Sequence, residues 1–215
     1  LFLRISLEPY LKRLLVGGFD RVYEIGKCFR NEGIDRTHNP EFTMLELYQA
    51  YGDYNDMMAL AEEIIVDTVM KVNGSPKVNF DGKEIDLTTP WKKIKMTDAI
   101  REYSGIDVMS MSDEELKSAV KKYGGEIKGD YIRGLAINEL FELLVEDKLI
   151  APTFVTHQPV ETTPLCKPDI EDERFLQRFE LFINGTEFAN AYSESNDPVF
   201  QRKTLYEQSL RREVD

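Results

Sequence analysis

Apolar and polar residues alternate along two neighbouring stretches near the start of the chain, residues 21–30 and 42–51. A repeat of two residues is typical of a strand with one buried face, so the pattern predicts two strands joined as a hairpin. The odd positions of the first stretch carry Tyr23, Ile25 and Phe29. The even positions of the two stretches combine small, charged and aromatic residues: Glu24, Gly26, Cys28, Arg30, Phe42, Met44, Glu46 and Tyr48.

The even face of this hairpin has two interpretations. Charged residues in strands usually face water, which would make the face an ordinary solvated surface. The face also carries an aromatic ring at Phe42 between the charges of Arg30 and Glu46, and the small residues Gly26 and Cys28 leave room above it. This combination favours the floor of a ligand site.

Helical periods and turn residues predict the other elements. A strand is expected at residues 1–6, and a short helix follows it, with Glu8 and Pro9 in the first turn and Gly17 at the end. The loop at 31–40 carries Glu32, His38 and Asn39. Later elements are a helix at 54–72, a hairpin around Asp81–Gly82, helices that begin near Thr97, at a Ser112–Glu115 capping box and near Asp130, and strands at 152–156 and 179–194.

The last predicted hairpin turns at Asn184–Gly185 and carries several polar residues. In a regular two-residue turn Phe182 faces Glu187 and Glu180 faces Ala189, so Glu180 and Glu187 share one face, either as solvated surface or as partners of a cation. Further along the strand, every second residue falls on the opposite face: Asn190, Tyr192 and Glu194. A bulge near Phe188 would be needed to bring them to the same side.

Composition narrows the class of protein. The chain has 215 residues, 31% of them charged, and a net charge of −12. A surplus of acidic residues disfavours these residues as the main docking surface for a nucleic-acid backbone. The sequence has no apolar run long enough to span a bilayer and no visible targeting segment. Cys28 and Cys166 lack the spacing of a metal site or a disulfide framework, which suits a reducing compartment.

Three segments carry a resemblance to a known family: FRNEG, HNPEFTMLELYQAY and FELFINGTEFANAYSE. They resemble class II lysyl-tRNA synthetases, and the first two correspond to the family's second signature motif. The resemblance implies an α+β fold, an antiparallel β-sheet flanked by helices, with a small helical insert. It divides the chain into catalytic core at 1–96, helical insertion at 97–150 and a second part of the core at 151–215. Where the family commonly has SELND, this chain has SESND at 193–197.

The same resemblance implies an activity: ATP-dependent activation of lysine to lysyl-adenylate, followed by transfer to tRNA(Lys), by a cytoplasmic homodimer that uses Mg²⁺. Arg30 would be the catalytic residue that bridges the lysine carboxylate and the α-phosphate. The implied ATP-binding residues are Arg30, Glu32, His38, Asn39 and Phe42. The implied lysine-binding residues are Glu8, Arg30, Glu46, Tyr48, Asn190, Tyr192 and Glu194, and the implied magnesium ligands are Glu180 and Glu187. Without the resemblance, Glu8 is explained by the favourable effect of a negative charge at a helix N-terminus.

We expect Arg30, Phe42, Glu46, Glu180, Glu187 and Glu194 to border one cavity. The first and third class II motifs and the N-terminal OB domain do not occur in these residues, so we expect a fragment that by itself activates lysine poorly or not at all. Two alternatives stay open. One is a paralogous lysyl ligase that acts on a translation factor; the other is a non-catalytic module that binds lysine and nucleotide.

Overall fold

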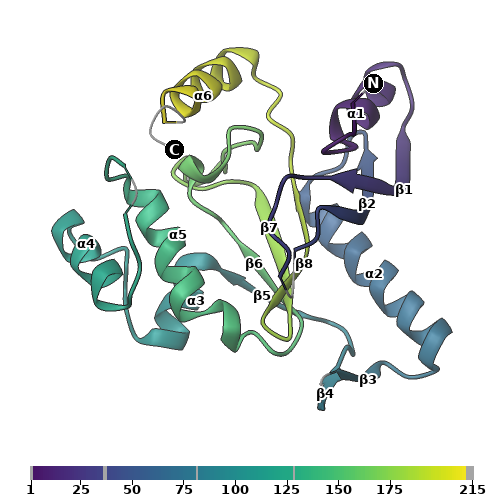
Figure 1. The fold of residues 1–215 in the computed structure, drawn as a ribbon, viewed down its shortest axis with the longest axis horizontal. Helices are drawn as coiled ribbons and strands as arrows, with labels where there is room; N and C mark the ends of the chain where they lie inside the picture. The colour runs from purple at the N-terminus through teal and green to yellow at the C-terminus, as the bar shows by residue number, and fades with distance from the viewer. Residues whose placement is uncertain (1, 36–37, 81, 128, 212–215) are drawn as a thin grey trace. The chain divides into compact units, whose positions relative to one another are not determined.

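A computed structural model describes residues 2–35, 38–80, 82–127 and 129–211. The chain divides into two compact units, residues 1–52 and residues 53–215 (Figure 1). Within the described ranges, no helix is both long and apolar enough to cross a membrane. Helices occur together with antiparallel and mixed sheets, so the predicted α+β class is confirmed.

The first unit is a hairpin with one helix. It contains α1 (Glu8–Val16), β1 (Arg21–Phe29) and β2 (Glu41–Gln49). The strands pair antiparallel, and the register places Glu24 opposite Glu46 and Cys28 opposite Phe42. All even positions of both strands therefore lie on one face, as the alternation predicts. Residues 2–6 form no strand, contrary to expectation; the backbone N–H of Phe29 donates to the carbonyl of Arg4, but no ladder continues from that bond.

The even face is the packed face of the first unit. Leu7 and Leu11 from the start of α1 lie buried against Cys28. Val22, Phe42, Met44 and Tyr48 pack around them. On the odd face, Tyr23 and Ile25 are 73% and 64% exposed within the chain. The apolar odd positions therefore contribute little to the core of this unit.

The second unit holds the remaining elements. They are α2 (Tyr54–Asn73), β3 (Lys77–Phe80), β4 (Lys83–Asp86), β5 (Lys92–Lys95), α3 (Met96–Ser104), α4 (Asp113–Lys122), α5 (Arg133–Leu144), the 3-10 turn η1 (Glu146–Lys148), β6 (Thr153–Thr156), the 3-10 turn η2 (Val160–Thr162), β7 (Arg178–Ile183), β8 (Thr186–Tyr192) and α6 (Pro198–Arg211). The main sheet has the order β5-β6-β7-β8. Its β5–β6 pair is parallel and the other pairs are antiparallel.

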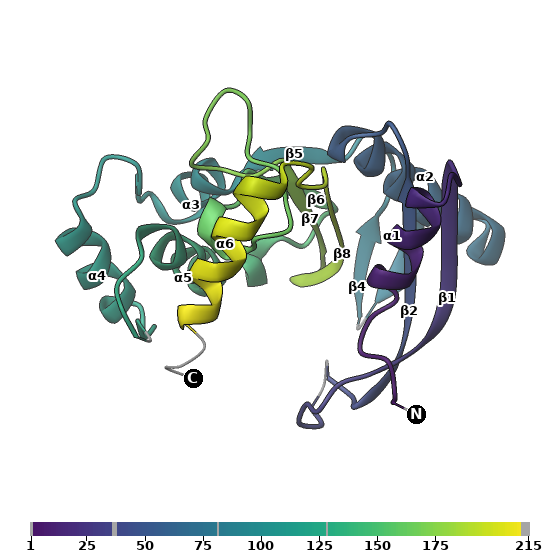
Figure 2. The same cartoon turned by 90° about the horizontal axis from the view of Figure 1, so that it is seen from above.

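Helices cover both faces of this four-stranded sheet. On one face α3, α4 and α5 pack against Val155 and Phe182. On the other face Met58 of α2 packs with Phe154, Phe179 and other apolar side chains of the sheet. Figures 1 and 2 show α3 and α5 together on one side of the sheet and α2 on the opposite side. Alternate residues of β6 and β7 thus belong to two separate cores.

Local signals located some helix starts and missed others. Ser112 and Glu115 form the predicted capping box of α4, with reciprocal side-chain and backbone hydrogen bonds. Thr97 is not a cap, because α3 already begins at Met96. The helix expected to begin near Asp130 begins at Arg133. The strands of the β3–β4 hairpin are present, whereas Asp81 in the predicted turn lies outside the described residues.

The β7–β8 hairpin contains a β-bulge near Phe188, which is needed to bring Asn190 to the same face as Glu187. Leu181 pairs with Ala189, but Phe182 pairs with Glu187, so Phe188 is the extra residue. As a result Glu180 faces Asn190 and not Ala189, which corrects the expected pairing. The extra residue reverses the parity of the rest of β8.

The tip of this hairpin is fastened to the segment after α5. Asn184 and Gly185 both have positive φ, 54° and 70°, as a tight two-residue turn requires. Their backbone N–H groups donate to the carbonyls of Ile150 and Leu149, each over 2.9 Å. A Cβ on Gly185 would approach the backbone of Asp147 to 3.2 Å. Glycine therefore serves both the turn and the close contact.

We predict that Gly185→Ala destabilises the protein more than Gly74→Ala. Both glycines have φ of +70°, but nothing lies within 4 Å of a Cβ at Gly74. Each change costs about 1–2 kcal/mol for the left-handed backbone, and crowding against Asp147 adds about 1 kcal/mol at Gly185. Urea unfolding of both variants measures the difference. Equal losses would contradict the close packing of the hairpin tip.

Candidate active site

Arg30 and Phe42 lie together at one end of the hairpin in the first unit. Arg30 directly follows β1, and its backbone N–H donates to the carbonyl of Pro40 over 3.0 Å. Its guanidinium carbon lies 5.1 Å from the centre of the Phe42 ring, a cation–π distance. Its Nε donates to the carbonyl of Ile5 over 3.3 Å. The side chain is exposed, so its other donors can reach a ligand.

Glu46 and Tyr48 lie further along the same face. Glu46 Oε1 accepts from the backbone N–H of Leu7 over 3.3 Å, and Oε2 accepts from the hydroxyl of Tyr48 over 3.1 Å. Leu7 is the residue that precedes α1, so the carboxylate faces the positive end of that helix. Both of these donors are neutral groups. The geometry leaves its negative charge available to a cation.

Glu8 occupies the first turn of α1, where a carboxylate is favoured by the helix dipole. Its Oε1 lies 2.6 Å from Nζ of Lys12, one helical turn later. Lys12 also lies 6.0 Å from the ring centre of Tyr48. The same helix therefore brings Glu8 and Lys12 beside the packed face of the hairpin.

Three polar side chains that the structure describes in the loop between β1 and β2 lie in solvent. Glu32, His38 and Asn39 are all exposed. His38 Nδ1 lies 2.9 Å from Oδ2 of Asp35, and the Asn39 side chain accepts from the backbone N–H of Glu41 over 3.4 Å. These residues stand at the Arg30 end of the hairpin, where Phe42 also lies.

A second group of predicted residues gathers on β7 and β8 of the other unit. Because of the bulge at Phe188, Glu180, Glu187 and Asn190 share one face. The Asn190 side chain donates to Glu187 Oε1 over 2.7 Å. Tyr192 pairs with Arg178 on the same face, and the Arg178 guanidinium lies 2.7 Å from Glu180 Oε1.

The carboxylates of this second group interact unfavourably with one another. Burial raises the pKa of Glu180; Arg178 lowers it, and the negative charge of Glu187 raises it. The pKa of Glu146 in η1 is raised to about 7, first by burial and then by the negative charges of Glu142, Glu180 and Glu187. Such a set of converging negative charges is relieved by a cation.

Magnesium suits Glu180 and Glu187 only with help from other oxygen ligands. Among the described residues, no three carboxylate, imidazole or thiol side chains are grouped so that they could hold a metal ion. Mg²⁺ is commonly held by one or two carboxylates together with substrate phosphates and water. The mutual repulsion of Glu180 and Glu187 fits such a partial ligand set.

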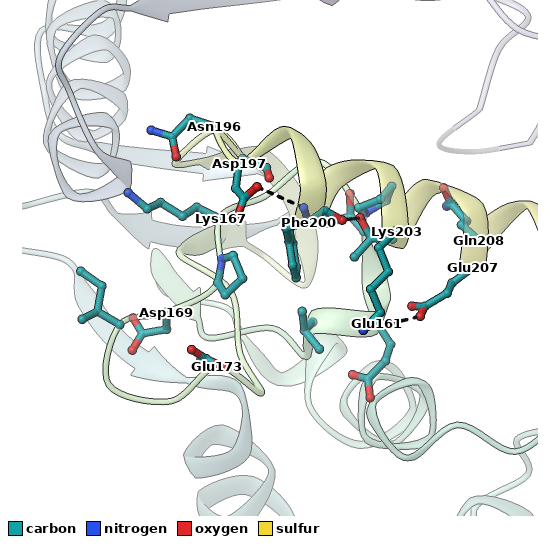
Figure 3. A pocket seen from close by; sticks show the side chains of 17 residues that line it. Glu161, Lys167, Asp169, Glu173, Asn196, Asp197, Phe200, Lys203, Glu207 and Gln208 are labelled. Atoms are coloured by element: carbon teal, nitrogen blue, oxygen red, sulfur yellow. Dashed lines mark hydrogen bonds and ion pairs between the residues drawn. The ribbon is translucent and has the colours of Figure 1, made fainter.

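Glu194 follows β8 and forms a backbone bridge with the buried Cys166. Just beyond it is a pocket of about 590 Å³ between α6 and the segment 160–173 (Figure 3). Figure 3 shows Asp197 at the start of α6, where its carboxylate accepts from the backbone N–H of Phe200 over 3.2 Å. The described lining of this pocket includes none of the predicted site residues.

The structure thus assembles the predicted residues into two groups, one in each unit. Arg30, Phe42, Glu46 and Tyr48 share the packed face of β1 and β2, while Glu180, Glu187, Asn190 and Tyr192 share a face of β7 and β8. A single cavity bordered by both groups stays a prediction.

Sequence reasoning missed charged residues that contact the predicted ones. Arg178 stands two positions before Glu180, and strand parity alone could have placed the two side chains on one face. Arg4 lies 2.6 Å from Glu24, and Glu146 lies after α5; neither had a local signal. Both reach their partners through long-range packing.

Comparison with known proteins places this geometry in a family. The family model described as tRNA synthetases class II (D, K and N) matches residues 1–215. The chain belongs to this family of class II synthetases.

Its relatives include several proteins named lysine–tRNA ligase. The one from Syntrophomonas wolfei is 53% identical over 213 residues, 99% of this chain and 43% of the relative. That from Saccharolobus solfataricus is 54% identical over 208 residues, 96% of this chain and 42% of the relative. That from Enterococcus faecalis is 52% identical over 214 residues, 99% of this chain and 43% of the relative. The chain therefore spans less than half the length of these relatives.

We predict that Glu146→Gln stabilises the protein at pH 8 and has little effect at pH 4.5. In the folded state the pKa of Glu146 is about 7, above its ordinary value of 4.5. The folded state therefore binds more protons between these two values, and wild-type stability falls as pH rises through them. Glutamine removes that loss.

Thermal unfolding at both pH values, without added Mg²⁺, measures this effect. Glu63→Gln, at an exposed position of α2, is the matched control. A gain from Glu146→Gln that is the same at both pH values would show that the carboxylate is not destabilised by ionisation.

Proposed function

We propose that the protein activates lysine with ATP to form lysyl-adenylate and transfers the lysyl group to tRNA(Lys). The observation that carries this proposal is the arrangement on the even face of the hairpin. At one end Arg30 lies over the Phe42 ring, and further along Glu46 is held by two neutral donors. One face thus offers a cationic, aromatic end for a nucleotide phosphate and base and an anionic part for an ammonium group. The names of the relatives support the same substrate.

In the first step, an oxygen of the lysine carboxylate attacks the α-phosphorus of ATP. A bond forms between this oxygen and the α-phosphorus, the bond from the α-phosphorus to the oxygen that bridges to the β-phosphate breaks, and pyrophosphate leaves. No protein nucleophile is required, so the residues act by positioning and by charge neutralisation. Arg30 provides a planar set of donors that can bridge the lysine carboxylate and the α-phosphate. Phe42 provides a ring surface for adenine, and Glu32, His38 and Asn39 provide polar groups around the nucleotide.

Selectivity for lysine depends on the ε-ammonium group. Glu46 provides the carboxylate, and the Tyr48 hydroxyl fixes its orientation. A site built around a charged partner disfavours neutral amino acids, because its carboxylate would lose water without gaining a counter-ion. Glu8 binds the α-amino group in this proposal, and Asn190, Tyr192 and Glu194 line the amino acid site.

Magnesium and partners complete the proposal. Glu180 and Glu187 would hold Mg²⁺ together with phosphate oxygens of ATP, and the bound ion supplies charge neutralisation for the departing pyrophosphate. We propose a cytoplasmic homodimer, in keeping with the family resemblance. The two buried thiols, Cys28 and Cys166, are consistent with a reducing compartment.

We predict that Arg30→Ala in the full-length protein lowers adenylate formation by about 100-fold or more, because the charge that neutralises the reacting oxygens is lost. Lysine-dependent exchange of pyrophosphate into ATP measures the step. Circular dichroism checks that the fold is retained, since the side chain is exposed. Arg30→Lys should recover only part of the rate, because an ammonium lacks the planar fork. Undiminished exchange in Arg30→Ala would remove Arg30 from the reaction.

We predict that Glu46→Gln raises the KM for lysine by about 30-fold or more, because the ammonium loses its counter-ion. The KM for ATP should change little. Glu41→Gln is the matched control: Glu41 lies on the same strand but on the opposite, exposed face. Equal increases in both KM values for Glu46→Gln would mean that Glu46 acts on the fold or on the nucleotide and not on lysine.

A further inference from the structure

Arg4 lies across the packed face of the hairpin, and the sequence did not predict it as a site residue. Its Nη1 lies 2.6 Å from Glu24 Oε1, and its Nε donates to the carbonyl of Lys27 over 2.9 Å. The backbone N–H of Phe29 donates to the Arg4 carbonyl over 2.9 Å, which ties this residue to the end of β1. The guanidinium is therefore held by contacts at both its backbone and its side chain.

Gly26 makes room for this guanidinium. A Cβ at Gly26 would overlap Nη2 of Arg4 and would also meet Glu24 Oε1 at 2.9 Å. Gly26 lies on the even face of β1, where its neighbours on the same face are Glu24 and Cys28. The missing side chain thus gives the guanidinium a place on the strand surface, beside the carboxylate with which it pairs.

The register explains why a cation is needed there. Glu24 and Glu46 are direct cross-strand partners on one face. Side chains at such positions start from Cβ atoms about 4.5–5.5 Å apart, and like charges in this arrangement repel. Arg4 neutralises Glu24, whereas Glu46 contacts the neutral donors of Leu7 and Tyr48. Among the residues that the structure describes, Glu24 has a cationic partner in Arg4, whereas none forms an ion pair with Glu46.

We propose that Arg4 is a positioning residue for amino acid selectivity: by neutralising Glu24 it leaves Glu46 as the single carboxylate of the pair that a substrate ammonium can meet. This inference rests on the proposed function. A single anion at a fixed point selects side chains by length, because a cation of different reach is left without a partner. Two adjacent anions would accept a cation from side chains of more than one length.

The test compares lysine with ornithine, which carries the same ammonium on a shorter side chain. In the full-length protein, Arg4→Gln should lower the ratio of kcat/KM for lysine to kcat/KM for ornithine by about tenfold, the range that one methylene controls in a selective pocket. The KM for ATP should stay near the wild-type value. Arg4→Lys keeps the positive charge and should keep most of the selectivity.

A second substitution makes the test specific to charge. Glu24→Gln alone leaves the Arg4 cation beside Glu46 and should raise the KM for lysine. Glu24→Gln combined with Arg4→Gln removes both charges and should restore the lysine-to-ornithine ratio. A purely structural ion pair predicts otherwise: loss of Arg4 would reduce activity with both amino acids equally, and the ratio would not change.

Gly26→Ala provides an independent variant that leaves Arg4 in the sequence. The new methyl group would displace the flexible end of the guanidinium, so the ratio should fall in the wild-type background and fall no further in Arg4→Gln. Lys27→Gln is the matched control, because Lys27 lies on the same strand, faces the opposite side and pairs with Glu41 over 3.2 Å. It should leave the ratio unchanged.

The outcomes separate this inference from the proposed function. If the wild-type protein exchanges pyrophosphate with lysine but Arg4→Gln keeps the wild-type ratio, the role of Arg4 is wrong and the proposed function stands. If the wild-type protein shows no lysine-dependent exchange, both are overturned. A lowered ratio that Glu24→Gln restores establishes the role of Arg4.

Discussion

The carboxylate of Glu46 lies on the packed face of a hairpin, and its two hydrogen bonds are the constraint on which the candidate site depends. One bond comes from the backbone of Leu7 at the start of α1, and the other comes from Tyr48 on the same strand. A half-buried carboxylate without hydrogen-bond donors would destabilise the folded state, so α1 must lie where the Leu7 N–H can reach Glu46. The buried contacts of Leu7 and Leu11 with Cys28 hold the helix there. The packing of α1 in the first unit therefore also determines how the charge of Glu46 is held.

A different device gathers the polar residues of the second unit. The extra residue at Phe188 reverses the parity of β8, so Asn190 joins Glu180 and Glu187 on one face. Ala189 and Ala191 then face the core beneath α2. Gly185 and the bonds from the hairpin tip to Leu149 and Ile150 fix the turn from which both strands extend. The bulge thus lets alanine side chains of β8 pack into the core on one side of the sheet and places two carboxylates together on the other side.

Local sequence signals predicted much of this architecture. Strand alternation placed the even residues of β1 and β2 on one face, the Asn184–Gly185 pair located a turn, and Ser112 with Glu115 located the start of a helix. The failures were of two kinds. Thr97 is a possible cap by residue type, but the helix begins one residue earlier. Residues 2–6 alternate like a strand, yet the arginine among them uses its side chain to cross β1 and forms no ladder.

Residues of the candidate site could be predicted where a sequence motif or the alternation of a strand placed them. Charged residues that reach the site from distant segments could not be predicted in this way. Arg178 could have been inferred from its spacing to Glu180, whereas the contacts of Arg4 with Glu24 and of Glu146 with the β7–β8 carboxylates depend on tertiary packing. These contacts set how many negative charges remain for a ligand.

The most direct measurement is a crystal structure of the full-length protein with lysine and a non-hydrolysable ATP analogue. The account predicts that the ε-ammonium nitrogen lies within hydrogen-bond distance of the Glu46 carboxylate, about 2.7–3.2 Å, while the Arg30 guanidinium contacts the α-phosphate. Lysine bound away from the even face of β1 and β2, or with its ammonium on another acid, would contradict it.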